Sequence, residues 1–374
     1  MTARWHLFCR VVDNFGDAGV CWRLARQLVR EHGLSVRLWI DVPRVLERMA
    51  PAAEGVDIRA WTGPFESADP AQVVVEAFGC GLPDAYVAAM ARRTPPPVWL
   101  VLEYLSAEAW VDGAHGLPSP HPRFPLVRRF WFPGFTARTG GLLRERGLFA
   151  ARDAFREDAG ARSAFWSSLA LPAPAANELR ISLFCYPQPA LGALLDAWAD
   201  GDVPVVCVVP DRTPAGAIDA WTRGEVPHPG RPFARGRLAL HAIPFLAQDD
   251  YDRLLWSCEL NFVRGEDSFV RAQWAARPFA WHAYPQDEGA HLRKVDAFLD
   301  RFCVGLAPSI AASVRGFHHA WNGAPGRADA LAEAWLDFDA ARPQLVDHAG
   351  GWAATLSRLP ELASGLVRTA ADQV

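Results

Sequence analysis

Two aspartates stand four residues apart in the segment DNFGDAG, residues 13–19, directly after the first apolar run of the chain. Asp13 and Asp17 fall where a turn is expected to lead into a helix, and the N-terminus of a helix favours negative groups. Two carboxylates there leave little room for a phosphate and suit a cation instead. The alternative interpretation is that one aspartate caps the helix while the glycines make the turn. Because a cap employs only one carboxylate well, the pair favours a functional site.

A second candidate site is the segment NFVRGEDSFVR, residues 261–271. A strand is expected to end at Val263 and a helix to begin near Ser268. Backbone N–H groups at that helix start could bind a diphosphate, helped by Ser268 and Arg264. Glu266 is then placed to accept hydrogen bonds from a ribose. An acidic capping turn explains the same residue types.

Aromatic and amide side chains follow other expected strands. Phe184 and Tyr186 stand at a sharp break after one strand, where either ring could stack on a planar base, and Phe245 and Gln248 could lie beside it. Tyr284 points to the same edge from the end of a later strand. Core packing is the competing interpretation for each ring, above all for Phe184.

Composition excludes several classes of protein. The chain has 38 basic and 42 acidic residues, and Lys294 is its single lysine. A Walker A loop and the protein-kinase lysine motif are therefore missing, and pyridoxal chemistry would have to rest on Lys294 inside an expected helix. With a net charge of −4, no basic excess indicates binding to nucleic acid or to an anionic membrane.

The cysteines, histidines and terminus indicate a cytoplasmic protein without a metal site. Seven scattered cysteines include no C-x-x-C pair, and the histidines are not spaced with carboxylates as metal ligands are. The N-terminus does not resemble a signal peptide, and no apolar stretch approaches the roughly 20 residues that span a bilayer.

Strand and helix patterns alternate along the chain, which predicts a doubly wound α/β architecture. Apolar runs typical of buried parallel strands lie at 7–12, 36–40, 73–75, 98–102, 179–184, 203–209 and 238–243. Helical patterns lie at 20–32, 44–49, 151–169, 190–198, 249–256, 268–276 and 290–302.

A length of 374 residues exceeds what one core usually organises, so two domains are expected. We expect an N-terminal domain over 1–165, a second domain over 170–355, and a C-terminal helix at 356–374 that packs back towards the first domain. The natural ligand site is then a cleft between the domains. The stretch 108–139, rich in proline and aromatic residues, is expected to be a long irregular loop with a function, such as contact with a partner protein.

Five segments together resemble the family of protein-arginine rhamnosyltransferases that modify bacterial elongation factor P. The resemblance runs from residue 5 into the C-terminal helices. It is carried by VDNFGD at 12–17, LEYLSAE at 102–108, PGF at 133–135, RGEDSFVRAQ at 264–273 and YPQD at 284–287.

The resemblance implies an inverting, metal-independent glycosyltransferase of GT-B fold, with two Rossmann-like domains facing across a cleft. It implies dTDP-β-L-rhamnose as the donor, an arginine side chain of elongation factor P as the acceptor, and no cofactor. The modified factor would rescue ribosomes stalled at polyproline. A cytoplasmic monomer that contacts neither nucleic acid nor membrane is expected.

The resemblance also implies roles for single residues. The N-terminal half would hold the acceptor, with Asp17 as general base and Asp13 orienting or assisting. Glu266 would be a third catalytic residue, in contact with the deoxyribose. The remaining residues implied in donor binding are Asn14, Phe15, Gly16, Phe184, Tyr186, Phe245, Gln248, Arg264, Asp267, Ser268 and Tyr284.

Two alternatives stay open on the residues alone. The first is a GT-B enzyme with another sugar donor or acceptor, since nothing around Glu266 specifies rhamnose. The second is a non-catalytic protein that binds a nucleotide sugar or elongation factor P. A nicotinamide dehydrogenase is disfavoured by the absence of G-x-G-x-x-G.

Overall fold

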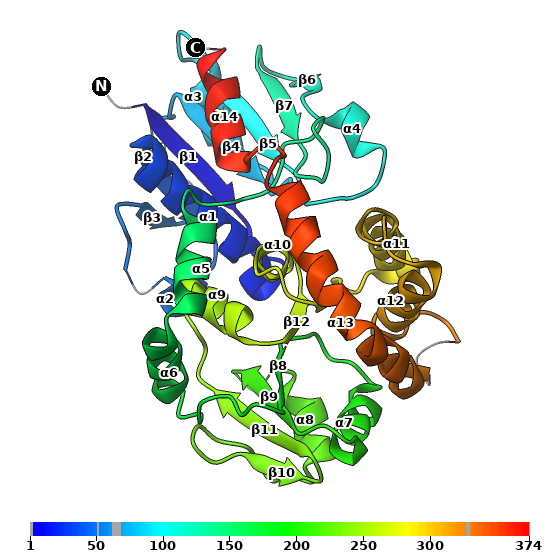
Figure 1. Ribbon diagram of the computed structural model, residues 1–374. Coiled ribbons are helices and arrows are strands. Elements are labelled where there is room, and N and C mark those ends of the chain that lie inside the picture. Colours follow the sequence, from blue (N-terminus) through cyan, green and yellow to red (C-terminus); the bar gives the residue numbers. More distant parts are fainter. Residues whose placement is uncertain (1–2, 51, 62–68, 212, 327–329, 374) are drawn as a thin grey trace. The chain divides into compact units, whose positions relative to one another are not determined.

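The computed structural model describes residues 3–50, 52–61, 69–211, 213–326 and 330–373. The chain divides into two compact units (Figure 1). The first unit comprises Met1–Arg146 together with Leu356–Val374, and the second comprises Gly147–Thr355.

A seven-stranded sheet forms the centre of the first unit, in the order β3-β2-β1-β4-β5-β7-β6. Neighbouring strands are parallel, except that β6 is antiparallel to β7. The strands are β1 (Arg4–Cys9), β2 (Ser35–Ile40), β3 (Asp57–Ala60), β4 (Val73–Ala77), β5 (Val98–Leu102), β6 (Pro118–Pro120) and β7 (Val127–Trp131). The helices are α1 (Asn14–His32), α2 (Arg44–Met49), α3 (Asp84–Ala91), α4 (Val111–Ala114) and α14 (Leu362–Ala371).

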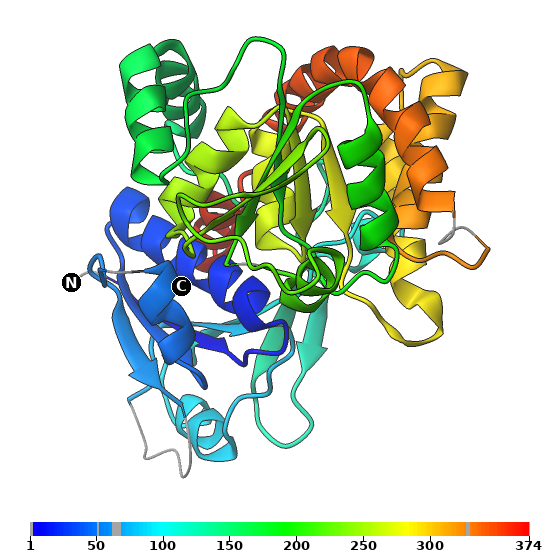
Figure 2. The same cartoon turned by 90° about the horizontal axis from the view of Figure 1, so that it is seen from below.

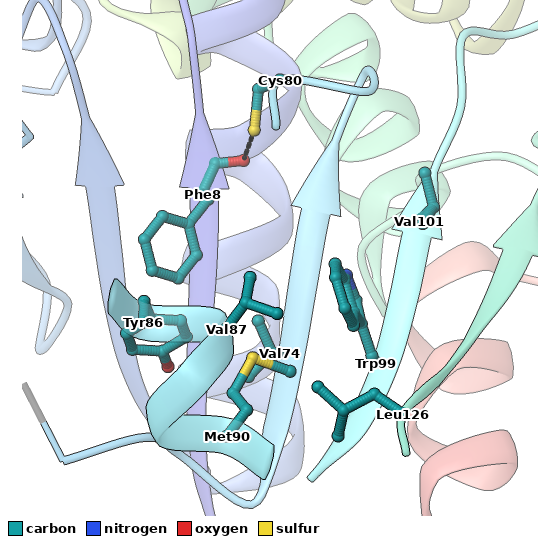
Figure 3. Packing of buried hydrophobic residues seen from close by; sticks show 9 residues of the cluster. All are labelled: Phe8, Val74, Cys80, Tyr86, Val87, Met90, Trp99, Val101 and Leu126. Atoms are coloured by element: carbon teal, nitrogen blue, oxygen red, sulfur yellow. Dashed lines mark hydrogen bonds between the residues drawn. The ribbon is translucent and has the colours of Figure 1, made fainter. Parts of the chain in front are cut away.

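Helices cover both faces of this sheet, which is why its central strands are apolar throughout. Rings and aliphatic side chains of β1, β4 and β5 pack against α3 on one face (Figure 3). On the other face Cys9 of β1 meets Cys21 of α1. Figure 2 shows α1 and α3 on opposite sides of the sheet. The doubly wound architecture predicted for this half is confirmed.

The stretch 108–139 is not the irregular loop that was expected, because it contains α4, β6 and β7. β7 extends the parallel sheet by pairing with β5. β6 begins and ends with proline and forms the edge of the sheet, where a strand can do without some backbone donors. The prolines therefore shape a sheet edge.

The C-terminal segment packs within the first unit. The N–H of Leu362 donates to the carbonyl of Leu142 at 3.1 Å. Glu361 caps α14 by accepting the N–H groups of Ala363 at 2.9 Å and Ser364 at 2.8 Å. Gly365 faces the Trp131 ring so closely that a Cβ would lie 2.7 Å from it.

The second unit has a six-stranded sheet in the order β10-β11-β9-β8-β12-β13, parallel except for β10. Its strands are β8 (Leu179–Leu183), β9 (Val205–Pro210), β10 (Phe233–Arg235), β11 (Leu238–Ile243), β12 (Leu260–Arg264) and β13 (Phe279–His282). Its α-helices are α5 (Leu148–Glu157), α6 (Ala159–Ser168), α7 (Leu191–Asp200), α8 (Ala215–Trp221), α9 (Gln248–Ser257), α10 (Asp267–Trp274), α11 (Ala290–Phe302), α12 (Pro308–Trp321) and α13 (Leu331–Leu356), with a 3-10 turn, η1, at Asp287–Gly289.

The second unit begins at Gly147, before the boundary between 165 and 170 that the sequence suggested. The reason is that α5 and α6 are anchored to its core. Phe165 and Trp166 of α6 pack in one cluster with side chains of β9, β11 and α9. Arg156 of α5 donates to the carbonyls of Trp256 and Ala275 in the same unit.

Within the described ranges no helix is long and apolar enough to cross a bilayer. All seven cysteines are buried thiols.

Buried histidines make the fold sensitive to acid. Burial, with smaller contributions from nearby arginines, lowers the pKa of His6 from 6.5 to about 4, and burial lowers the pKa of His318 likewise. Below pH 6.5 the unfolded chain takes up protons that these folded sites do not accept. We therefore expect the free energy of unfolding to fall between pH 6.5 and about pH 4, by about 3 kcal/mol for each histidine.

Urea unfolding at pH 7.5, 5.5 and 4.5 measures this loss. H318Q removes one titrating group and should flatten the pH dependence, whereas H228Q, at an exposed position, should leave it unchanged. Equal slopes for the two variants would contradict the assignment.

Candidate active site

The strand order reverses beside the first strand of each sheet. β1 lies between β2 and β4, and β8 lies between β9 and β12. In open α/β sheets, ligands bind beyond the carboxyl ends of the strands at such a point. The segments that follow β1 and β12 carry the two motifs singled out in the sequence, so each motif stands at the reversal point of its own sheet.

Helix α1 begins at Asn14, six residues before the helix that the apolar spacing predicted. Residues 14–17 therefore form its first turn. Asp17 explains the early start, because its Oδ2 accepts the N–H groups of Val12 at 2.8 Å and Asp13 at 2.9 Å. This contact resembles the returning half of a capping box and fixes the carboxylate, which is only 2% exposed.

Asp13 occupies the N-cap position of α1, but its side chain makes no capping hydrogen bond. Its carboxylate instead lies against Gly16, where a Cβ would come within 2.6 Å of Oδ2. The simple capping interpretation is therefore wrong for Asp13. Phe15 lies under the Arg48 guanidinium at 5.9 Å. The Asn14 side chain lies outside the described part of the chain.

The loop between β1 and α1 is held from its other side as well. The N–H of Val11 donates to Oδ1 of Asp41, directly after β2, at 2.9 Å. Carboxylates from two elements thus fix residues 11–13, and the Asp17 position follows from that anchoring. Nothing in the sequence pattern singled out Asp41.

In the second unit, Arg264 contacts two predicted aromatic residues, and a third packs against one of them. Its guanidinium packs over the Phe184 ring at 4.2 Å and the Tyr186 ring at 4.8 Å, and it donates to the Cys185 carbonyl at 3.3 Å. Tyr186 meets Tyr284 edge to face at 5.4 Å. These four predicted site residues therefore lie together, and two of the three rings pack against the Arg264 guanidinium.

The turn between β12 and α10 is built on Gly265. Its φ of +61° favours glycine, and its carbonyl accepts the Trp281 indole N–H at 2.9 Å. The Ser268 hydroxyl bonds both the N–H and the carbonyl of Arg264. The hydroxyl of Ser268 therefore stabilises the turn. An anion bound at this segment would be contacted by the backbone N–H groups at the start of α10.

The remaining predicted residues surround the start of α10. Gln248, the first residue of α9, donates from Nε2 to Oδ2 of Asp267 at 3.2 Å. Glu266 stands at the N-cap of α10 without a side-chain capping bond. Phe245 is half-buried in the segment between β11 and α9.

Two comparisons identify the family. The family model described as elongation-factor P (EF-P) rhamnosyltransferase EarP matches residues 5–371. A protein-arginine rhamnosyltransferase of Pseudomonas putida (strain KT2440) is 49% identical over 98% of both chains. The chain belongs to this family. The protein-arginine rhamnosyltransferase of Pseudomonas aeruginosa (strain PAO1) is 45% identical over 99% of both chains.

A solved structure of the family agrees with this membership. The structure described as the basis for EarP-mediated arginine glycosylation of translation elongation factor EF-P matches with a TM-score of 0.71 and 37% identity, covering 100% of both chains. Spinosyn rhamnosyltransferase SpnG shares the fold, with a TM-score of 0.50 at 13% identity over 99% of this chain and 100% of its own. The expected α/β fold class, with two Rossmann-like units of GT-B type, is confirmed.

Sequence reasoning missed two buried side chains that pack against the predicted aromatic residues of the second unit. Tyr251 packs edge-on against Phe184 at 5.9 Å, and its phenol, close to Ser268 and Asp267, has a pKa raised by burial. His282 lies against Tyr186 at 5.4 Å, and burial lowers its pKa to about 3. No sequence signal separated either residue from ordinary core.

A buried ion pair fixes α9 to α10. Arg271 donates from Nε to Oδ1 of Asp252 at 2.9 Å and from a terminal nitrogen to Oδ2 at 2.5 Å, and both side chains are at most 4% exposed. The pair sets the position of the helix start that carries Asp267 and Ser268.

Removing one partner of this pair should destabilise the second unit strongly. D252A leaves a buried guanidinium without its counter-charge, which costs about 3–5 kcal/mol. D250A is the matched control on the same helix, because the exposed Asp250–Arg253 pair contributes less than about 1 kcal/mol. Urea unfolding midpoints measure both changes. Similar losses in the two variants would show that the buried pair does not anchor α10.

Proposed function

We propose that this protein transfers an L-rhamnosyl group from dTDP-β-L-rhamnose to an arginine side chain of elongation factor P, with inversion at the sugar carbon. Family membership over residues 5–371 supports the activity and the protein acceptor. The observation that carries the mechanism is the carboxylate of Asp17, which is fixed through one oxygen at the start of α1.

The first unit supplies the chemistry for the acceptor. A guanidinium has a pKa above about 12 and no lone pair for attack, so one N–H proton must leave as the new bond forms. Both hydrogen bonds that the described residues donate to Asp17 end on Oδ2. Oδ1 is thus the atom that takes the proton, and Asp13 beside Gly16 adds a second carboxylate that holds the cation.

The second unit binds the donor. The start of α10 presents backbone N–H groups at Asp267 and Ser268, where they stabilise the charge that gathers on the departing diphosphate. Glu266 binds the deoxyribose, and Phe184, Tyr186, Phe245 and Gln248 surround the thymine.

Arg264 and Tyr284 complete this donor site. The Arg264 guanidinium packs on Phe184 and Tyr186, so this guanidinium must move when the thymine of the donor binds between these rings. A single displacement inverts the configuration of the sugar carbon, and the general base Asp17 then acts from the face opposite the departing diphosphate. The step as written requires no metal and no cofactor beyond the donor, and it belongs to the cytoplasm, where elongation factor P acts.

The first experiment is intact-mass analysis of elongation factor P after incubation with this protein and dTDP-β-L-rhamnose. We expect a gain of one deoxyhexose on an arginine. D17N keeps an oxygen for the two N–H groups but takes up no proton, so transfer should fall by roughly a hundredfold or more.

D41N is the matched control, because its amide oxygen still accepts the Val11 N–H, and it should keep most of the transfer. Donor affinity, measured by calorimetry, should be unchanged in both variants. Donor binding without any mass change would identify another acceptor, and turnover by D17N at the normal rate would contradict its role as base. If another nucleotide sugar is present as a competitor and its sugar is transferred in preference, the proposed donor is wrong.

Gly16 provides an independent test of the Asp13 position. G16A places a methyl group 2.6 Å from Oδ2 of Asp13, too close for contact, and the carboxylate must move. Alanine in a helix is about 0.5–1 kcal/mol more favourable than glycine. This gain offsets part of the cost of moving the carboxylate, so the free energy of unfolding should change little. We expect a melting temperature close to that of the parent together with a large loss of transfer. Full activity would show that the Asp13 carboxylate has no part in the reaction.

A further inference from the structure

Strand β13 lies at the edge of the second sheet, so one side of its backbone faces no neighbouring strand. Its other side pairs with β12, and the carbonyl of His282 accepts the N–H of Gly265 there at 3.3 Å. Backbone groups alternate between the two sides of a strand, so those of Trp281 and of Ala283, the first residue after β13, point to the open side. Both residues are buried, and their polar backbone groups therefore need partners from outside the sheet.

The end of helix α12 supplies these partners. Asn322 directly follows α12; its Nδ2 donates to the Trp281 carbonyl at 2.8 Å and its Oδ1 accepts the Ala283 N–H at 2.9 Å. Nδ2 also donates to the His318 carbonyl at 2.8 Å, and Nε2 of His318 accepts the Trp281 N–H at 3.4 Å. Asn322 is only 4% exposed. Its amide takes the place of a neighbouring strand on both sides of His282.

The chain then turns back, so that His291 meets the segment that follows β13. The turn η1 contains two residues in the left-handed region, Glu288 with φ of +55° and Gly289 with φ of +66°. In the first turn of α11, Nδ1 of His291 accepts the Gln286 N–H at 3.2 Å, and Nε2 lies 3.1 Å from the Asn322 carbonyl. An N–H group only donates and a carbonyl only accepts, so the ring is neutral with its proton on Nε2.

Tyr284 lies between these two anchors. The Asn322 side chain fixes the backbone one residue before Tyr284, and the His291 ring fixes the backbone two residues after it. The two anchors are joined, because His291 donates to the Asn322 carbonyl. Tyr284 is itself 45% exposed, and its ring meets Tyr186 edge to face. A largely exposed tyrosine thus stands on a backbone that is held from both sides.

We propose that His291 and Asn322 are positioning residues that hold Tyr284 in place for the nucleotide-sugar donor. A segment that is already ordered loses little conformational entropy when a ligand binds, so more of the contact free energy appears as affinity. Neither residue contacts the donor; both act through the backbone around Tyr284. This inference rests on the proposed function, in which Tyr284 belongs to the donor site, and it adds the residues that support that tyrosine.

Donor affinity tests the proposal, measured by calorimetry on the full-length protein with dTDP and with dTDP-β-L-rhamnose. H291A removes both contacts of the ring and leaves the buried Asn322 amide in place. We expect affinity to fall about three- to tenfold, the effect of one or two ordinary hydrogen bonds. KM for the donor should rise to a similar extent, while kcat changes by less than about twofold. H291N returns an acceptor near the position of Nδ1 and should recover most of the loss.

A double-mutant cycle separates positioning from general stability. In a Y284A background, adding H291A should lower donor affinity by less than about twofold, because the ring that His291 positions is gone. A merely structural role would give the same loss in both backgrounds. N322A should weaken donor binding as well, together with a lower melting temperature, because it uncovers the edge of β13.

H319Q is the matched control. It removes a histidine contact between the same two helices, from Nε2 of His319 to Oδ1 of Asp296 at 2.6 Å, and should leave donor affinity unchanged. Affinity equal to that of the parent in H291A, or an equal loss with and without the Tyr284 ring, would overturn the proposal, while transfer by the parent enzyme would leave the proposed function standing. Unchanged affinity in N322A would overturn the role of Asn322. A parent that binds neither dTDP nor dTDP-β-L-rhamnose would instead refute the proposed function.

Discussion

The reversal of strand order in each sheet is the constraint on which the rest of the structure depends. Parallel strands that helices cover on both faces expose polar loops only at their ends. At the reversal point the connections after two neighbouring strands leave towards opposite faces of the sheet, after β1 and β4 in the first unit and after β8 and β12 in the second. The candidate residues of the two motifs follow such a strand end, except Arg264, which is the last residue of β12. The helices that begin there present N–H groups and accept acidic side chains, so the same geometry suits cation and anion chemistry.

The two units use this geometry for opposite charges. At the edge of the first sheet Asp13 and Asp17 follow β1, the strand at the reversal point. At the edge of the second sheet the α10 start carries Arg264 on aromatic faces. The first arrangement fits a guanidinium and the second a nucleotide diphosphate, which are the substrates of the proposed transfer. Family membership and the residue chemistry of the two edges both support the proposed transfer.

Polar side chains secure both edges, and all of them except the half-buried Asp41 are buried. Asp17 and Asp41 tie the loop after β1, Glu76 ties the loop after β4, and the Asp252–Arg271 pair ties α9 to α10. Each occupies a position where an unpartnered charge would be costly, so each holds its segment in one conformation. Such support keeps a carboxylate or a helix start within the tolerance that proton transfer and leaving-group stabilisation require.

The sequence alone determined the architecture of each unit, because continuous apolar runs and helical spacing are local properties. It also located both motifs and, through the resemblance, the family. Only the tertiary structure decided that α1 begins at Asn14, that 108–139 adds two strands, and that the Ser268 hydroxyl is used within its own turn. The pairing of Phe78 with Tyr104, far apart in the chain, was equally invisible in the sequence. These features depend on contacts between distant segments, and local residue patterns do not specify which distant side chain will satisfy a given donor or cover a given ring.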